Sequence, residues 1–326
     1  MFQLKKEMTI KASEQFEEVN KLEPIYKGEL FLLDPYAKLT SIWGSLAEAY
    51  LNRKLADSAK WAFMEGKKRG GFSETFFGLN KQILNSCDKN SILISYGDNI
   101  TIPIWYLQTI ENYRTDITVV DANLVNTIWY PKYLKSERNL KMSFSDAHID
   151  TIDYMQWKPQ YVNVVNPIDT MQKFSWELRP TYMENYILKG DRMLLDIIQQ
   201  NFYNRPMYFS LNSDSSYNLV CRITDKVINY EEDVFNVSQN LYNYNIAKIN
   251  KDDITRSRDA IIVLNNFRWA FLYNVYHLVV QGNYYKAKEL IKQMTDNFSK
   301  EKLPFPSEEA EKYFADYLGQ VDKDYH

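Results

Sequence analysis

The sequence predicts an α/β protein in which an open, mostly parallel sheet is flanked by helical hairpins at both ends of the chain. Apolar residues recur at helical spacing near both termini, whereas short apolar runs alternate with amphipathic segments in the middle. The 326 residues contain only 10 glycines and 10 prolines, which favours long helices and few long loops. We therefore expect helical regions over 1–85 and 236–326, and an α/β domain over 86–235.

At the N-terminal end, the segment 41–70 has the pattern of a tetratricopeptide repeat, a motif of two antiparallel helices. Such a pattern places small residues where the two backbones approach and large residues in the groove between them. The matching positions are Trp43, Leu46, Ala47, Tyr50, Ala59 and Phe63. Gly71 stands where the repeat usually carries a proline, so the turn that leaves the hairpin departs from the pattern.

A second tetratricopeptide-like hairpin is predicted near the C-terminus, over 267–294. Its first helix ends at Gly282 and Asn283, because glycine readily adopts the left-handed conformation that ends helices. A further helix is expected within 303–321, with Ser307 as its N-cap.

The central region alternates strands with helices. A strand over 91–99, a helix over 101–114 and a strand over 116–125 form one unit, whose two strands we expect to be parallel. The later elements are a third strand over 160–166, a helix over 190–202, a strand over 205–211 and an edge strand over 218–230. This order is typical of an open Rossmann-like sheet with helices on its faces.

Polar residues follow the first two strands of this sheet. Gly97, Asp98 and Asn99 lie where the first strand ends, and Asp121 and Asn123 follow the second. Carboxyl ends of parallel strands meet at one edge, so Asp98 and Asp121 could share a crevice that binds a metal, a sugar or an amine. The alternative is that Asp98 or Asn99 caps the following helix while Gly97 makes the turn. Since no third ligand with metal spacing follows, we expect no metal.

Aromatic residues lie beside these positions in two pairs, Trp105 with Tyr106 and Trp129 with Tyr130. Sugar-binding sites use such rings because ring faces complement the apolar faces of sugars. Packing in the core is the alternative role of these rings. Trp105 and Trp129 are therefore candidate ligand-binding residues.

Composition and motifs argue against several classes of function. With 39 basic and 42 acidic residues the net charge is −3, and no large basic patch suggests nucleic-acid binding. No glycine-rich phosphate loop is present and no histidine pairs with a nucleophile in a known motif, so we expect neither a cofactor nor a catalytic residue. Cys87 and Cys221 are interpreted as buried thiols rather than a disulfide.

Neither a membrane span nor a signal peptide is predicted. No apolar run reaches the roughly 18 residues that a span needs. The N-terminal stretch begins with charged residues and lacks the apolar core of a signal peptide. We therefore expect either a cytoplasmic protein or one whose export signal has been removed.

Four short motifs keep their order within 97–135. They are Gly97-Asp98-Asn99, Pro103-Ile104-Trp105-Tyr106, Arg114-Thr115-Asp116 and Asn126-Thr127-Ile128-Trp129-Tyr130. With these motifs, the segment 191–210 and the C-terminal hairpin, the chain resembles the soluble C-terminal region of a bacterial family over residues 40–325. Members of that family are multi-spanning, protein-O-mannosyltransferase-like membrane proteins with a large extracytoplasmic tail. Ile100 and Ile128 replace two aspartates of the family pattern, which speaks against shared acid–base or metal chemistry.

The resemblance implies a location in the cell envelope or periplasm and a partner in a membrane or envelope complex. In glycosyltransferases of that membrane class the catalytic carboxylate lies in the membrane part, so the resemblance implies that this chain does not transfer a sugar alone. We predict a non-catalytic scaffold or protein-interaction module that binds a protein partner through its helical repeats. The alternative is a carbohydrate-binding or hydrolytic enzyme that uses Asp98 and Asp121. A pocket holding both carboxylates and an exposed ring would favour that alternative.

Overall fold

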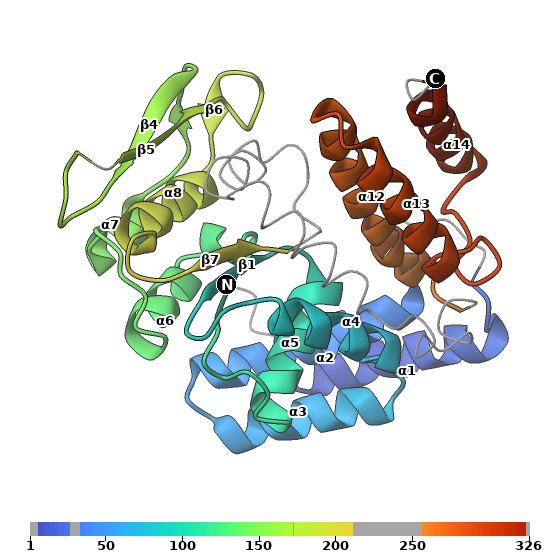
Figure 1. The fold of residues 1–326 in the computed structure, drawn as a ribbon. Coiled ribbons are helices and arrows are strands. Elements are labelled where there is room, and N and C mark those ends of the chain that lie inside the picture. Colours follow the sequence, from blue (N-terminus) through green and yellow to red (C-terminus); the bar gives the residue numbers. More distant parts are fainter. Residues whose placement is uncertain (1–5, 27–32, 172, 211–255, 324–326) are drawn as a thin grey trace. The chain divides into compact units, whose positions relative to one another are not determined.

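The computed structural model describes residues 6–26, 33–171, 173–210 and 256–323 (Figure 1). It confirms the α/β fold class. The chain divides into two compact units, one made of residues 1–82 and 230–326 and the other of residues 83–229. The predicted edge strand over 218–230, the following connector and Cys221 lie outside the described residues.

The central unit contains a parallel sheet of three described strands. They are β1 (Ile92–Ser95), β2 (Thr118–Asp121) and β7 (Met207–Phe209), in the order β2-β1-β7. β1 is parallel to both of its neighbours, and the register places Ser95 beside Asp121. β1 and β2 are buried along their whole length, as expected for parallel strands with both faces covered. The predicted strand–helix–strand unit is therefore confirmed.

Helices cover this sheet. α5 (Asp98–Ile110) connects β1 to β2, and α8 (Lys189–Asn201) precedes β7. In Figure 1, α8 and α5 lie on opposite sides of β1 and β7. The short helices η1 (Leu124–Asn126), α6 (Trp129–Glu137) and α7 (Asp146–Thr151) follow β2.

The segment predicted as a third strand of the sheet forms a separate hairpin instead. β4 (Gln160–Val165) pairs antiparallel with β5 (Lys173–Leu178), and β7 takes the third place in the parallel sheet. In β4, Val162 and Val164 are buried while the other four residues of the strand are exposed. One covered face and one open face suit an antiparallel hairpin, whereas a central parallel strand is buried on both faces. A second small hairpin joins β3 (Met155–Gln156) to β6 (Tyr186–Ile187).

The other unit is helical. From the N-terminal part it contains α1 (Lys6–Leu22), α2 (Pro35–Asn52), α3 (Ala56–Lys68) and α4 (Glu74–Asn85), whose last residues cross into the central unit. From the C-terminal part it contains α12 (Arg258–Val280), α13 (Tyr284–Asn297) and α14 (Glu308–Lys323).

Helices form where the sequence pattern predicted them. The buried positions in α2 and α3 include five of the six pattern residues, namely Trp43, Leu46, Ala47, Ala59 and Phe63. Trp43 Nε1 also donates a hydrogen bond of 2.9 Å to Ser13 Oγ, which joins α1 to α2. In the C-terminal part, Gly282 has the left-handed φ of 74°, and Ser307 Oγ accepts from the amide of Ala310 as an N-cap does.

Candidate functional site

The carboxyl ends of the three parallel strands bring polar side chains together at one edge of the sheet. We call Ser95, Asp98, Thr101 and Asp121 the carboxyl-edge cluster. Ser210 follows β7 at the same edge, where its amide donates to the carbonyl of Ile94 at 2.9 Å. After β1 the chain continues to β2 on one side, and β7 later joins on the other side, so this edge is a topological switch point. Ligands of open α/β sheets bind at such points.

Asp121 is held by hydrogen bonds from its own chain. Its Oδ1 accepts from the amides of Asn123 at 2.8 Å and Leu124 at 2.9 Å, and its Oδ2 accepts from Thr101 Oγ1 at 2.6 Å. Burial raises the pKa of Asp121, while these three bonds oppose the rise. The carboxylate therefore orders the turn between β2 and η1.

The hydroxyls of the cluster form a directed chain. Thr101 Oγ1 lies 2.8 Å from Ser95 Oγ and donates its only proton to Asp121. Ser95 must consequently donate to Thr101. The chain from Ser95 through Thr101 to Asp121 links β1, α5 and β2, and all three side chains are buried.

Asp98 occupies the first position of α5. The N-cap is Gly97, with φ 85° and ψ 149°. The expectation that Asp98 or Asn99 is the cap residue is thus wrong, because glycine alone tolerates this backbone conformation without strain. Burial, assisted by the negative charge of Asp121, raises the pKa of Asp98 to about 6. Of the two candidate asparagines, Asn99 is buried, whereas Asn123, on the turn after β2, is exposed.

The two candidate tryptophans pack around Tyr130. Trp105 is only 8% exposed, and its ring centre lies 6.2 Å from that of Tyr130. Trp129 is half-buried and meets Tyr130 edge-on at 5.3 Å. The Tyr130 hydroxyl accepts from the Asp121 amide at 3.0 Å and donates to the Val119 carbonyl at 3.1 Å. These rings pack together at the end of β2, in agreement with the alternative role of packing in the core.

Two arginines, Arg114 of the Arg114-Thr115-Asp116 motif and Arg205 just before β7, also have structural roles. Arg114 donates to the carbonyls of Leu84, Cys87 and Asp88 and forms an ion pair with Asp116. Arg205 donates to the carbonyls of Asn90 and Ser91 and to the Thr118 hydroxyl. Both guanidinium groups thereby hold the segment that leads into β1. Burial raises the pKa of the Cys87 thiol to about 12, as expected for an inert thiol.

Asn126 joins the turn after β2 to the start of α8. Its Oδ1 accepts from the Gly190 amide at 2.7 Å, and its Nδ2 donates to the Asn123 carbonyl at 3.2 Å. Both bonds run between the Asn126 side chain and backbone atoms. The link to α8, 64 residues later, has no signal in the local sequence.

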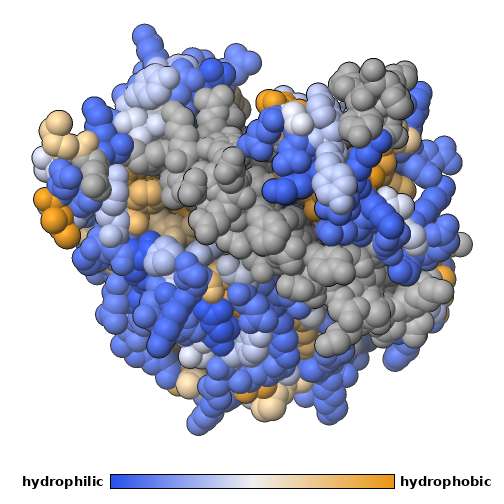
Figure 2. Space-filling model, viewed as in Figure 1, coloured by the Kyte–Doolittle hydropathy of each residue, from blue (hydrophilic) through white to orange (hydrophobic). Residues whose placement is uncertain are grey.

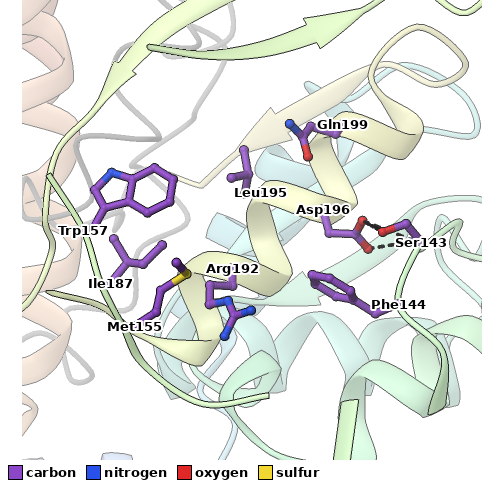
Figure 3. A pocket seen from close by; sticks show the side chains of 9 residues that line it. All are labelled: Ser143, Phe144, Met155, Trp157, Ile187, Arg192, Leu195, Asp196 and Gln199. Carbon is purple, nitrogen blue, oxygen red and sulfur yellow. Dashed lines mark hydrogen bonds between the residues drawn. The ribbon is translucent and has the colours of Figure 1, made fainter. Parts of the chain in front are cut away.

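A pocket that the sequence did not reveal lies elsewhere in the central unit, against α8 (Figure 3). Four residues of α8 contribute to it, Arg192, Leu195, Asp196 and Gln199. Their spacing of three, four and seven residues places them on one face of the helix. The spacing of these four residues could have been read from the sequence. The other walls of the pocket come from distant segments, which the sequence does not place next to α8.

Residues 78–179 match the model of a family described as TMEM260-associated domain 2. That family model describes a domain of the TMEM260 family of protein-O-mannosyltransferase-like membrane proteins. The matched stretch contains β1, α5 and β2, with the carboxyl-edge cluster and the four motifs between 97 and 135. No curated protein and no solved structure matches the chain. Within the described ranges, no helix has the length and apolar character needed to cross a bilayer.

Proposed function

We propose that this chain is a non-catalytic protein-interaction module that serves a membrane-embedded, glycosyltransferase-like complex of the cell envelope. The match to a domain of a membrane-protein family supports the membrane context. The hydrogen bonding of Asp121 supports a structural rather than a catalytic role for the carboxyl-edge cluster. The observation that carries the proposal is an apolar surface on the β4–β5 hairpin, which differs from the helical repeats to which the sequence analysis assigned partner binding.

The loop of this hairpin exposes large apolar side chains. Ile168 is 95% exposed and Met171 is 88% exposed. On the open face of β4, Tyr161 and Val165 extend the same apolar character. Hydrophobic residues at the left edge of Figure 2 lie where Figure 1 shows this loop. Single exposed apolar residues are normal, but a group at the tip of a projecting hairpin is typical of a contact surface.

A photo-crosslinking experiment tests this proposal. Benzoylphenylalanine placed at Ile168 in cells of the native host should form an adduct with one specific protein of the envelope. The same probe at Lys158, an exposed residue of the same unit outside the loop, is the matched control. We expect the Met171→Asp change to weaken the adduct formed from position 168. Identical adducts from both positions, or none from position 168, would contradict the proposal.

A second candidate function is a ligand site at the carboxyl-edge cluster, for a carbohydrate or for a hydrolytic reaction. The pKa of Asp98 near 6 favours it, because perturbed carboxyl groups gather at functional sites. Glycan-array binding by wild type that is lost in Asp98→Asn, with an unchanged melting temperature, would support this candidate. Equal binding by both proteins would count against it.

A further inference from the structure

The pocket against α8 is formed by three separate segments of the central unit. It encloses about 240 Å³. In Figure 3, Met155, Trp157 and Ile187 form one wall, Ser143 and Phe144 form the opposite wall, and α8 forms the floor. We call this cavity the α8 pocket. Drug-sized ligands occupy cavities of roughly 300–1,000 Å³, so this one suits a ligand of one or two fused rings.

Most of the surface of the α8 pocket is apolar. Phe144, Met155, Trp157, Ile187 and Leu195 surround it. Trp157 is held in place, because its Nε1 donates to the Leu178 carbonyl at 2.9 Å. A fixed indole beside aliphatic side chains favours a flat apolar group.

Asp196 organises the opposite wall and does not offer its charge to a ligand. Its Oδ1 lies 2.5 Å from Ser143 Oγ, and its Oδ2 accepts from the Ser143 amide at 3.0 Å. The carboxylate is buried. Its role is to attach Ser143, and with it Phe144, to α8.

Arg192 provides the available charge of the pocket. Its side chain lies between Met155 and Phe144 (Figure 3). Among the described residues it donates one side-chain hydrogen bond, from Nη1 to the Asp153 carbonyl at 2.8 Å. A guanidinium has five N–H donors, and its planar fork matches a carboxylate. The anchored group therefore keeps donors for an anion at the edge of an apolar cavity.

We propose that the α8 pocket binds a small aromatic carboxylate, with the ring against Trp157 and Leu195 and the acid group on Arg192. This inference goes beyond the proposed protein-interaction function and rests on different residues. A cationic ligand of the same size would be rejected, because its charge would face the guanidinium.

Isothermal titration of the whole chain with indole-3-acetate and phenylacetate tests the proposal, with tryptamine as the cationic counterpart. We expect at least one of the two acids to bind and tryptamine to bind at least tenfold more weakly. Arg192→Gln should weaken acid binding by about tenfold or more, since a charge-assisted hydrogen bond is lost. Arg179→Gln changes an exposed arginine outside the pocket and should leave binding unchanged.

A second variant tests the volume of the pocket independently of its charge. Leu195→Trp should fill the cavity and abolish acid binding, and because Leu195 is half-buried the fold should tolerate the larger ring. Thermal melting of each variant establishes that it is folded. The proposal is wrong if neither acid binds at millimolar concentration. It is equally wrong if tryptamine binds as well as the acids, or if folded Arg192→Gln and Leu195→Trp bind like wild type.

Discussion

Asp34 and Asp259 are 225 residues apart, and each donates its backbone amide to the carboxylate of the other. The Asp34 amide lies 2.5 Å from Asp259 Oδ2, and the Asp259 amide lies 3.1 Å from Asp34 Oδ2. Asp34 also caps α2 through the amide of Ala37 and accepts from the hydroxyl of Ser257. Both carboxyl groups are buried. This reciprocal bond ties the first residues of α12 to the start of α2 within the helical unit.

The pair predicts a dependence of stability on pH. Burial, with the nearby Asp34 charge, raises the pKa of Asp259 to about 6, above the value of about 3.9 expected in the unfolded chain. The folded protein therefore favours the protonated form of Asp259. The stability gained from this protonated form is fully present below about pH 4 and is lost as pH rises through about 6. Asp259→Asn cannot ionise, so its melting temperature relative to wild type should increase between pH 4 and pH 7. Asp296→Asn, at an exposed position of α13, is the control, and a constant difference for Asp259→Asn would refute the prediction.

Arg268 is a buried cation that holds the turn after α13. Its guanidinium donates to the carbonyls of Phe298, Ser299 and Leu303, and it lies 4.1 Å from the ring centre of Phe305. Burial lowers its pKa to about 10, so it stays charged at neutral pH. Arg268→Met leaves several carbonyls without donors and should cost about 3 kcal/mol or more.

Urea unfolding measures this cost, and Arg268→Lys is the matched variant. Lysine keeps the charge but lacks the planar fork, so its free energy of unfolding should lie between those of wild type and Arg268→Met. An Arg268→Met protein within 1 kcal/mol of wild type would show that the carbonyls find other partners.

Gly190 lies too close to Asn126 to carry a side chain. A Cβ at Gly190 would come within 2.5 Å of Asn126 Nδ2. Gly190→Ala should therefore displace Asn126, break its bond to the Gly190 amide and destabilise the fold by about 1–3 kcal/mol. Gly78→Ala is the matched control, because a Cβ at this position of α4 meets no atom within 4 Å. Alanine there should stabilise the chain by about 0.5–1 kcal/mol. Chemical denaturation that gave both changes the same sign would contradict this explanation.

The two carboxyl groups of the carboxyl-edge cluster should respond differently to amide substitution. Asp121→Asn turns an N–H group toward a hydrogen-bond donor and should cost about 1–3 kcal/mol. Asp98→Asn removes a charge that burial disfavours. Because the folded pKa of Asp98 is near 6, this variant should gain melting temperature relative to wild type above that pH and lose the gain toward pH 4. Thermal melting at both pH values checks this, and an Asp98→Asn variant destabilised like Asp121→Asn would disprove it.

Local patterns were sufficient for much of the fold. The apolar run before Gly97, the helical spacing after it and the β-branched residues before Asp121 predicted a strand–helix–strand unit. Since such units place their strands in parallel, the proximity of Asp98 and Asp121 could also be expected. The cap at Gly97 was misassigned because Asp98 and Asn99, which follow it, are both common capping residues, and the backbone φ of Gly97 is not visible in a sequence.

By itself, the sequence determined the helices at both ends of the chain, the strand–helix–strand unit of β1, α5 and β2, and the helix and strand over 190–211, because periodicity and turn chemistry act over a few neighbouring residues. Only the tertiary structure decided that β7 is the third described strand of the parallel sheet, whereas β4, with one covered and one exposed face, pairs with β5. It also joined Asp34 to Asp259 and Asn126 to Gly190, and it assembled the α8 pocket from three distant segments. Such contacts depend on shape complementarity between elements far apart in the chain, which no local pattern records.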